Sequence, residues 1–432
     1  MGKCQRAEGS EVRLKSPPDI PVEKLNAQAV ERMARGRIQL MSVGRALETI
    51  PRMRSNMILH PGPPVAWERM TAALQGAIVG ALLYEGIAES EDQARDMSIR
   101  GRVIFEPGQD HHAVCPSASV ISPSMPVLII RNETYNNFGY CTLNEGPGRV
   151  LRYGAFKTEA LERLRWIEKT LAPVFRQAIA AAGRIDLSNI MSQAVQMGDD
   201  LNQQTRAATA LLIRVMSPHM ARTCSNREML AQILSFIDSH NPFFQNLAMA
   251  AAKAALEPAQ GIPGSGVVTA LGSNGTGFGI QISGLAGDWF VTPIHPPDGL
   301  YLPGYSTLDA QPVTGDGALL EGYGLGAFIL AGAPVNMRFL GGSTAEAVQI
   351  TQDMYTISAG ESIQFSIPAL DMRGSPLGID VQKVAAAQRL PRFYAEVIHK
   401  QPGVGPVGAG LWQPPLACFE AAAAAIRQEQ SE

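Results

Sequence analysis

A glycine-rich stretch between Gly264 and Gly342 decides how we interpret the rest of the chain. It begins GSGVVTALGSNGTGFGI (residues 264–280), continues GDGALLEGYGLG (315–326) and closes MRFLGG (337–342), without a lysine anywhere in it. Short β-prone runs alternate with glycines, which permit positive φ or let a second backbone or a ligand come close. One interpretation is a sheet with tight turns, and the other is a cradle of backbone N–H groups for a small anionic or polar ligand.

Polar residues beside the glycines favour the ligand cradle. A second glycine-rich loop, IHKQPGVGPVGAG (398–410), places His399 and Lys400 ahead of Gly403, Gly405 and Gly408. Glycines and a cation before a closing helix are typical of phosphate or carboxylate binding. Its spacing fits neither the P-loop nor the Rossmann fingerprint. The polar residues and the glycine of the first stretch that we include as binding candidates are Asn274, Gly275, Thr276, Asp316 and Glu321.

Composition excludes several classes of protein. The 432 residues include 36 Lys and Arg and 39 Asp and Glu, so charge gives no case for a nucleic-acid or membrane partner. No apolar run is long enough for a membrane span, and the polar first residues lack the apolar core of a secretory signal. Five unpatterned cysteines predict a cytoplasmic protein without disulfides. No CxxC or HExxH pattern occurs, so we expect no metal site, and we predict no cofactor.

The length predicts two or three domains. We expect a flexible tail (1–20), an N-terminal α/β lobe (21–156), an all-helical domain (157–258) and a glycine-rich C-terminal α/β lobe (259–432). In the helical part, apolar residues recur at helical spacing, and Pro218 predicts a break between two helices. Later in the chain we expect a strand at 355–359. The predicted fold class is therefore mixed α/β, two α/β lobes with an inserted all-helical domain, and a ligand site at the junction of the lobes.

Two adjacent histidines supply the first residues with chemical character. His111 and His112 lie in a predicted loop, QDHHAVC (109–115), and imidazole titrates near neutral pH. Acid–base chemistry, a solvated surface loop and a metal site shared with Cys115 all fit this pattern. Cys115 and Cys141 are also candidate nucleophiles, although a buried cysteine acting as a small hydrophobic residue is the better interpretation.

A polar turn follows a β-prone segment at Asn144-Glu145-Gly146, and binding residues concentrate in such turns. Arg149 and Arg152 lie close by and can hold an anion, although paired arginines near a helix are more often solvated. Farther along, the polar connection MGDDLNQQTR (197–206) offers side chains that either reach a ligand or cap the next helix.

Several strings taken together resemble one family over nearly the whole chain, from about residue 25 to 422. They are AWERM (66–70), ISPSMPV (121–127), CTLNEG (141–146), LRYGA (151–155), ERLRW (162–166), NGTGFGI (274–280), LYLPGY (300–305), IPALDMRGSPLGID (367–380) and HKQPGVGPVGAG (399–410). This set is similar to the AllG/YlbE-like family, which is usually found beside FdrA-like proteins. The family includes a component of oxamate carbamoyltransferase in anaerobic allantoin breakdown, a branch of purine catabolism.

The resemblance implies phosphorolysis of oxalurate, or a related ureido or carbamoyl compound, to carbamoyl phosphate. It implies an FdrA-like subunit and a third subunit as partners, with the small substrate and phosphate as ligands. Apart from the resemblance, the helices rich in alanine and glycine and the near-neutral charge are compatible with a homodimer. Two other functions stay open: a phosphate-independent amidohydrolase acting on a ureido or amide substrate, and a non-catalytic scaffold for FdrA-like partners.

Carbamoyl transfer to phosphate needs a cradle for phosphate, donors for the carbonyl oxygen and a proton for the leaving nitrogen. We predict that the glycine loops hold phosphate or the substrate, that Arg373 and Lys400 neutralise charge, and that Asn144 orients the amide. The candidate catalytic residues are His111, His112, His399 and Glu145.

Overall fold

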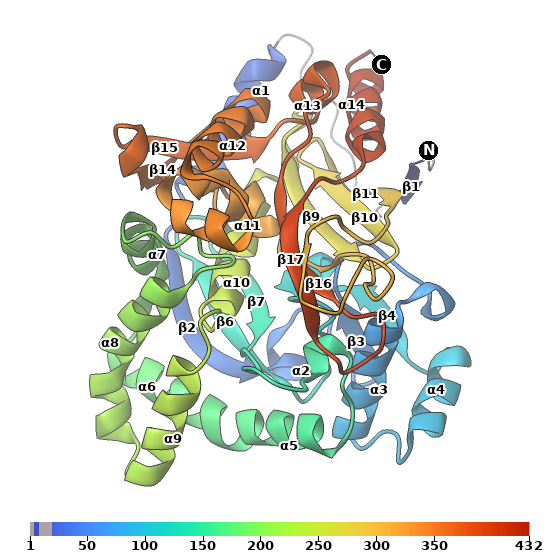
Figure 1. The fold of residues 1–432 in the computed structure, drawn as a ribbon, viewed down its shortest axis with the longest axis vertical. Coiled ribbons are helices and arrows are strands. Elements are labelled where there is room, and N and C mark those ends of the chain that lie inside the picture. Colours follow the sequence, from blue (N-terminus) through green and yellow to red (C-terminus); the bar gives the residue numbers. More distant parts are fainter. Residues whose placement is uncertain (1–3, 8–19, 432) are drawn as a thin grey trace.

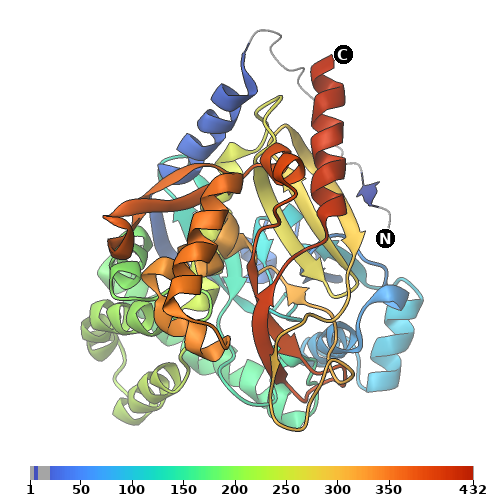
Figure 2. The same cartoon turned by 45° about the horizontal axis from the view of Figure 1, so that its top comes forward.

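The computed structural model describes residues 4–7 and 20–431, and it confirms the mixed α/β class (Figure 1). Two five-stranded sheets are present, and helix α10 (Gln245–Leu256) contacts strands of both. Figure 2 shows the same arrangement from a second direction. Within the described part of the chain, no helix is both long and apolar enough to cross a membrane.

The N-terminal segment forms most of the first sheet, which has the strand order β5-β7-β6-β2-β8. Strand β6 reads PVLIIRN, and aliphatic and β-branched side chains of this kind suit a largely buried strand. The elements are α1 (Val22–Ala34), β2 (Ile38–Arg45), α2 (Ala46–Thr49), β3 (Met57–His60), η1 (Trp67–Arg69), α3 (Ala72–Tyr84), α4 (Glu91–Ile99), β4 (Ile104–Pro107), η2 (Gly108–His111), β5 (Ala113–Val114), β6 (Pro126–Asn132), β7 (Asn137–Thr142) and η3 (Leu151–Tyr153).

The middle segment is mainly helical, and its helix α10 packs directly on β6 and β7. The small alanine side chains of α10 and the absence of a side chain at Gly139 of β7 allow this close approach. A Cβ on Gly139 would lie 2.1 Å from the carbonyl oxygen of Ala250. The elements are α5 (Thr158–Trp166), η4 (Ile167–Leu171), α6 (Ala172–Ala182), β8 (Ile185–Asp186), α7 (Leu187–Gln196), α8 (Arg206–Thr223), α9 (Arg227–Asp238), α10 and η5 (Glu257–Ala259).

The predicted helix break at Pro218 is wrong, because α8 continues through it. Proline removes one backbone hydrogen bond and disfavours a helix interior. Here Met216 and Met220, on either side of it, are buried in the core. The burial of the helix face therefore outweighs the local cost of the proline.

The C-terminal segment forms the second sheet, with strand order β1-β11-β10-β9-β13 and antiparallel pairing. Strand β1 (Gln5–Ala7) lies within the predicted flexible tail, 1–20, but it pairs with β11; residues 8–19 lie outside the described residues. The other elements are β9 (Val268–Asn274), β10 (Gly277–Ile282), β11 (Leu285–Pro293), β12 (Leu300–Tyr301), β13 (Thr314–Gly315), α11 (Leu319–Gly322), η6 (Gly326–Gly332), η7 (Pro334–Phe339), α12 (Thr344–Ile357), β14 (Ser358–Ile367), η8 (Pro368–Leu370), β15 (Arg373–Ile379), α13 (Val381–Ala387), β16 (Phe393–Ile398), β17 (Pro406–Trp412) and α14 (Leu416–Ser431).

The strand expected at 355–359 is also corrected, because α12 extends to Ile357 and β14 begins only at Ser358. A capping box between Ser343 and Glu346 starts this helix. Buried side chains then recur every three or four residues to Ile357, which is the spacing of one helix face.

One hydrophobic cluster contains residues of all three predicted segments. Leu40 of the first sheet, Phe175 of α6, Ala250 of α10, Leu271 of β9 and Phe365 of β14 all belong to it. The helical segment thus packs against both sheets, and the glycine-rich sheet is held close to helices and loops of the earlier segments.

Candidate functional site

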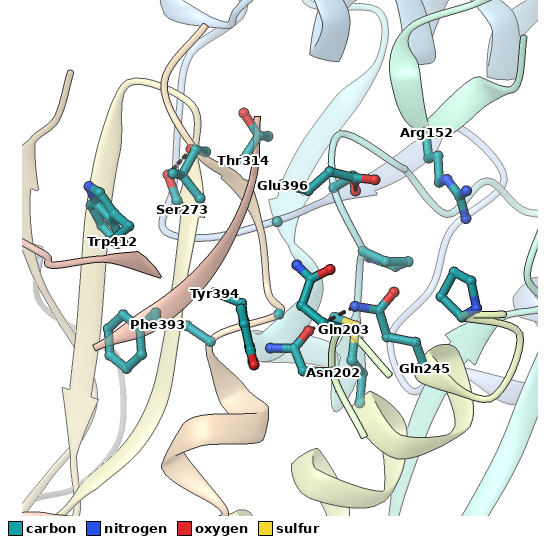
Figure 3. A pocket seen from close by; sticks show the side chains of 18 of the residues that line it. Arg152, Asn202, Gln203, Gln245, Ser273, Thr314, Phe393, Tyr394, Glu396 and Trp412 are labelled. Atoms are coloured by element: carbon teal, nitrogen blue, oxygen red, sulfur yellow. Dashed lines mark hydrogen bonds between the residues drawn. The ribbon is translucent and has the colours of Figure 1, made fainter. Parts of the chain in front are cut away.

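A cavity of about 160 Å³ lies where the three segments meet. A cavity of about 150 Å³ holds a molecule of the size of benzene, so this one suits a small metabolite. Its wall is polar on several sides (Figure 3). The residues that line it are Pro116, Ser117, Arg152, Tyr153, Asn202, Gln203, His240, Pro242, Gln245, Met249, Ser273, Phe278, Val313, Thr314, Gly315, Gly317, Ala318, Phe393, Tyr394, Glu396 and Trp412.

Arg152 is the cation of this wall, and the turn before it holds it in place. The carboxylate of Glu145 accepts hydrogen bonds from the backbone N–H groups of Leu151 (2.6 Å) and Arg152 (3.2 Å). Asn144 Oδ1 accepts a hydrogen bond from Arg152 Nη1 at 3.1 Å. The predicted residues Asn144 and Glu145 therefore do not line the cavity but position the arginine that does.

Burial acts to lower the pKa of Arg152, but Tyr153, Glu396 and Glu145 outweigh it and raise that pKa, although no carboxylate among the described residues forms an ion pair with this side chain. Its side chain is buried, and Nη2 donates to the carbonyl oxygen of Gly146 (3.2 Å) and to His240 Nε2 (3.5 Å). Nε has no partner, and no ion pair joins Arg152 to a carboxylate within the described residues. Burial and the nearby arginines lower the pKa of His240 to about 3, so this imidazole is neutral at physiological pH.

Glu396 of β16 brings a carboxylate to the same cavity. Ser117 Oγ donates to Glu396 Oε2 at 2.6 Å, and Tyr153 Oη donates to Glu396 Oε1 at 2.8 Å. Ser117 has a positive φ of 50°. A Cβ on Gly315 would lie 2.6 Å from the backbone nitrogen of Ser117, so a glycine is required for β13 to approach this residue.

Amide side chains form the facing wall. Figure 3 shows Arg152 and Glu396 on one side of the open space, and Asn202, Gln203 and Gln245 on the other. Gln245 Nε2 donates to Asn202 Oδ1 at 2.9 Å. Asn202 and Gln203 belong to the polar connection 197–206, where Asp200 Oδ1 accepts the backbone N–H of Asn202 at 2.8 Å, and Gln245 is the first residue of α10.

Glu321, a predicted binding residue, lies directly behind that wall. It is fully buried, and its Oε1 accepts hydrogen bonds from Asn202 Nδ2 (3.0 Å) and from the backbone of Ala327 (3.1 Å) and Tyr394 (3.2 Å). Oε2 has no partner. Burial raises the pKa of Glu321 to about 8, so the carboxyl group is mainly protonated at neutral pH.

Asp316, another predicted binding residue, bonds to groups within the protein and does not face the cavity. Its carboxylate accepts hydrogen bonds from the backbone of Gly62 (2.9 Å) and Cys115 (2.8 Å) and from Gln109 Nε2 (2.7 Å). It is buried and does not line the cavity. Burial raises its pKa to about 6. Its three donors come from the N-terminal segment, so Asp316 links that segment to the one that contains β13 and α11.

The histidine pair lies outside the cavity, and its two members have different partners. His111 Nε2 contacts Glu106 Oε2 at 2.5 Å, and His112 Nδ1 contacts Glu257 Oε1 at 2.7 Å. In the described part of the chain, no group of three or more His, Cys, Asp or Glu side chains is arranged to hold a metal ion. Cys115 and Cys141 are buried, and burial raises the pKa of both thiols.

The remaining predicted site residues with basic side chains lie in two separate places. Arg373 sits on the exposed β14–β15 hairpin, where it pairs with Glu361 at 2.6 Å. His399 and Lys400 belong to the turn between β16 and β17, well below the β14–β15 hairpin in the view of Figure 1. Lys400 Nζ donates to the carbonyl oxygen of Leu308 at 2.6 Å, and His399 Nδ1 accepts the backbone N–H of Gln401 at 2.9 Å. None of the three lines the cavity.

The glycine loops use several of their N–H groups internally. Asn274 Oδ1 accepts the backbone N–H of Thr276 at 3.0 Å, and Gly275 N donates to Ser273 Oγ at 3.2 Å. Gly403 N donates to the carbonyl oxygen of Tyr153 at 2.7 Å. Of the predicted glycines, Gly275, Gly403, Gly405 and Gly408 occupy turns and strand positions and do not line the cavity.

Comparison with known proteins places this arrangement in a family. The sequence profile described as "Oxamate carbamoyltransferase subunit AllG" matches residues 103–317. A protein of that name from Escherichia coli K12 is 38% identical over 410 residues, which cover 94% of this chain and 98% of that protein. The chain belongs to the AllG family. This confirms the resemblance drawn from the sequence strings.

Two further relatives match this chain over most of its length. The "Uncharacterized protein YahG" of Escherichia coli K12 is 36% identical to this AllG family member over 407 residues, 94% of this chain and 86% of YahG. The crystal structure of a conserved protein of unknown function from Enterococcus faecalis V583 has a TM-score of 0.92 and 36% identity, covering 94% of this chain and 98% of that one. The fold is therefore that of an experimentally determined relative.

Proposed function

We propose that this chain binds a small anionic carbamoyl compound in the central cavity and acts as one subunit of a carbamoyltransferase. The observation that carries the proposal is the buried Arg152, which lines the cavity. Its direct hydrogen-bond partners Asn144, Gly146 and His240 are neutral, and the nearby Glu145 and Glu396 form no ion pair with it among the described residues. Removing a guanidinium group from water costs free energy, and carboxylates that are close but not in contact offset this cost only in part. A carboxylate or phosphate ligand offsets that cost, and the name of the AllG relative indicates a carbamoyl compound.

The reaction that we propose is phosphorolysis of oxalurate or a related ureido compound. An oxygen of hydrogen phosphate forms a bond to the terminal carbamoyl carbon, and the bond from that carbon to the inner nitrogen breaks. The leaving nitrogen takes up the proton of hydrogen phosphate, so the products are carbamoyl phosphate and oxamate. Atoms and charge balance without a cofactor.

The cavity wall has the groups that this chemistry requires. Arg152 would hold the substrate carboxylate, and amide groups such as that of Gln203 would donate to the carbonyl oxygen as negative charge develops. His240 can also donate: because its Nε2 faces Arg152 Nη2 at 3.5 Å, the ring hydrogen of the neutral imidazole belongs on Nδ1.

Dependence on other subunits follows from the charges. Phosphate and oxalurate are both anions, yet Arg152 is the one Lys or Arg among the described residues that line the cavity. A second anion beside the first needs a second cation. We propose that an FdrA-like subunit or the third subunit supplies it, so the isolated chain binds substrate but does not turn it over.

The test measures carbamoyl phosphate release from oxalurate and a panel of ureido acids. Each is offered with and without phosphate, to the purified chain alone and to the chain with its FdrA-like and third subunits. Product that requires both phosphate and the partners is the expected result. Phosphate-independent ammonia release by the chain alone would replace the transferase with an amidohydrolase. Activity of the partners without this chain would reduce it to a scaffold.

A further inference from the structure

We infer that Glu396 is a specificity-determining residue, which accepts hydrogen bonds from the ureido N–H groups of the ligand and rejects a second carboxylate at that end. The ligand class is then a small molecule with one anionic group and one N–H-rich neutral end. This inference rests on the proposed function, because it concerns the same cavity. It goes further by naming the residue that distinguishes a ureido acid from a dicarboxylic acid.

The first support is the geometry of the carboxylate. Each oxygen of Glu396 accepts one hydroxyl hydrogen, from Ser117 at 2.6 Å and from Tyr153 at 2.8 Å. A carboxylate has about four acceptor sites, so acceptor capacity is left over. No ion pair of Glu396 occurs within the described residues, and the side chain lines the cavity.

The second support is the placement of opposite charges. Arg152 and Glu396 lie on the same side of the open space in Figure 3, and both line one cavity of about 160 Å³. A small ligand can therefore touch both. A group with N–H donors is attracted to a carboxylate held by two hydroxyl donors, whereas a second carboxylate is repelled by it. Such a repulsive element is a common source of specificity.

The third support is the backbone around Ser117, which holds the carboxylate in place. Ser117 adopts a φ of 50°, a conformation that costs a non-glycine residue free energy. Gly315 lacks the Cβ that would otherwise lie 2.6 Å from Ser117 N. Backbone strain of this kind persists where the surroundings impose it, and here it places a hydroxyl group on Glu396.

The experiment compares two ligands that share an oxo-carboxylate half and differ in the other half, where oxalurate has two nitrogens with N–H groups and oxaloacetate has CH2 and a second carboxylate. Oxalurate and oxaloacetate have the same number of non-hydrogen atoms, but oxaloacetate carries a second carboxylate where oxalurate carries an amide. Their dissociation constants are measured by isothermal titration on the full chain, together with its partner subunits. We expect the wild-type protein to bind oxalurate at least about tenfold more tightly than oxaloacetate.

Substitution of the carboxylate then tests its role. Glu396→Gln should bring the ratio of the two dissociation constants close to one, because the repulsion is lost and an amide can donate to a carboxylate. Ser117→Ala keeps the charge and should keep the preference for oxalurate. Glu361→Gln, at an exposed ion pair on the β14–β15 hairpin, is the matched control and should leave both constants unchanged.

The outcomes separate the two proposals. Equal binding of both ligands by the wild-type protein, or an unchanged ratio in Glu396→Gln, would overturn the role of Glu396 and leave an anion-binding cavity. Binding of neither ligand would remove the proposed function itself. If Glu396→Gln does not fold, the wild-type ratio and the Glu396→Asp variant, which should retain the preference, still decide the matter.

Discussion

Asn202 Nδ2 donates a hydrogen bond to Glu321 Oε1 at 3.0 Å, and this contact connects the cavity wall to a buried, protonated carboxyl group. The other oxygen of Glu321 has no hydrogen-bond partner. Burial favours the neutral form of this carboxyl group and raises its pKa to about 8, which makes the stability of the folded state sensitive to pH.

The first prediction concerns that sensitivity. The pKa of Glu321 is about 8 in the folded state, against 4.5 as its ordinary value. Between these values the folded protein keeps a proton that the unfolded chain releases, so the free energy of unfolding falls as pH rises. The slope for one proton is at most about 1.4 kcal/mol per pH unit. Glu321→Gln should show a smaller decline between pH 5 and 8.

Denaturant unfolding at pH 5, 6, 7 and 8 measures this difference. The exposed variant Glu361→Gln is the control and should decline as the wild-type protein does. Asp199 and Asp316 also have pKa values raised to about 6, so a residual decline below pH 7 is expected in every variant. Identical slopes for Glu321→Gln and wild type would contradict the protonated state of Glu321.

The second prediction concerns the anion site. Arg152→Gln removes the charge while keeping a polar side chain, and it should weaken oxalurate binding about 10- to 100-fold, or about 1.4 to 2.8 kcal/mol. Isothermal titration provides the dissociation constants. Arg373→Gln removes an exposed arginine that pairs with Glu361 and should change nothing. Unaltered binding by Arg152→Gln would move the ligand out of this cavity.

The third prediction concerns the junction of the lobes at Asp316. Replacing this residue with alanine leaves the N–H groups of Gly62 and Cys115 and the amide of Gln109 without their acceptor. Loss of a buried charged acceptor should cost about 3 to 5 kcal/mol of unfolding free energy. Urea denaturation checks this. Asp96→Asn, at an exposed helical ion pair, should stay within about 0.5 kcal/mol of wild type.

The fourth prediction concerns the approach of α10 to the first sheet. Gly139→Ala introduces a Cβ that would lie 2.1 Å from the Ala250 carbonyl oxygen, and it should destabilise the protein by about 1 to 3 kcal/mol or more. Gly317→Ala places its Cβ in open space and should be neutral or stabilise by up to about 1 kcal/mol. Thermal unfolding should therefore show a lower midpoint temperature than wild type for Gly139→Ala, and an unchanged or higher one for Gly317→Ala.

Local sequence patterns were enough to predict the family and to locate the helical middle segment. Strings such as NGTGFGI (274–280) and IPALDMRGSPLGID (367–380) were sufficient to recognise the family, because many short matches in the same order rarely occur by chance. Helical spacing located the middle segment, since the burial of one helix face repeats along the sequence. It misplaced the boundaries at Pro218 and Tyr355, where burial of whole helix faces overrides local propensity.

Only part of the candidate site could be predicted from the sequence. The turn at Asn144 and Glu145 and the nearby Arg152 stood out as polar residues in a glycine-flanked turn. Glu396 did not, because a single acidic residue within a hydrophobic strand carries no motif. His240 and Gln245, which reach the cavity from the middle segment, have no sequence signal beyond their residue type.

Family, fold class and the helical middle segment thus follow from the order and periodicity of residues along the chain. The cavity does not, because its wall joins residues as far apart as Ser117 and Glu396, which contact only through folding. Tertiary packing also gives several predicted ligand-binding residues partners within the protein. Asp316 and Glu321 are buried and accept hydrogen bonds from backbone donors, and His111 and His112 contact the carboxylates of Glu106 and Glu257. Burial and charge partners determine what a polar side chain does, and both are properties of the folded chain.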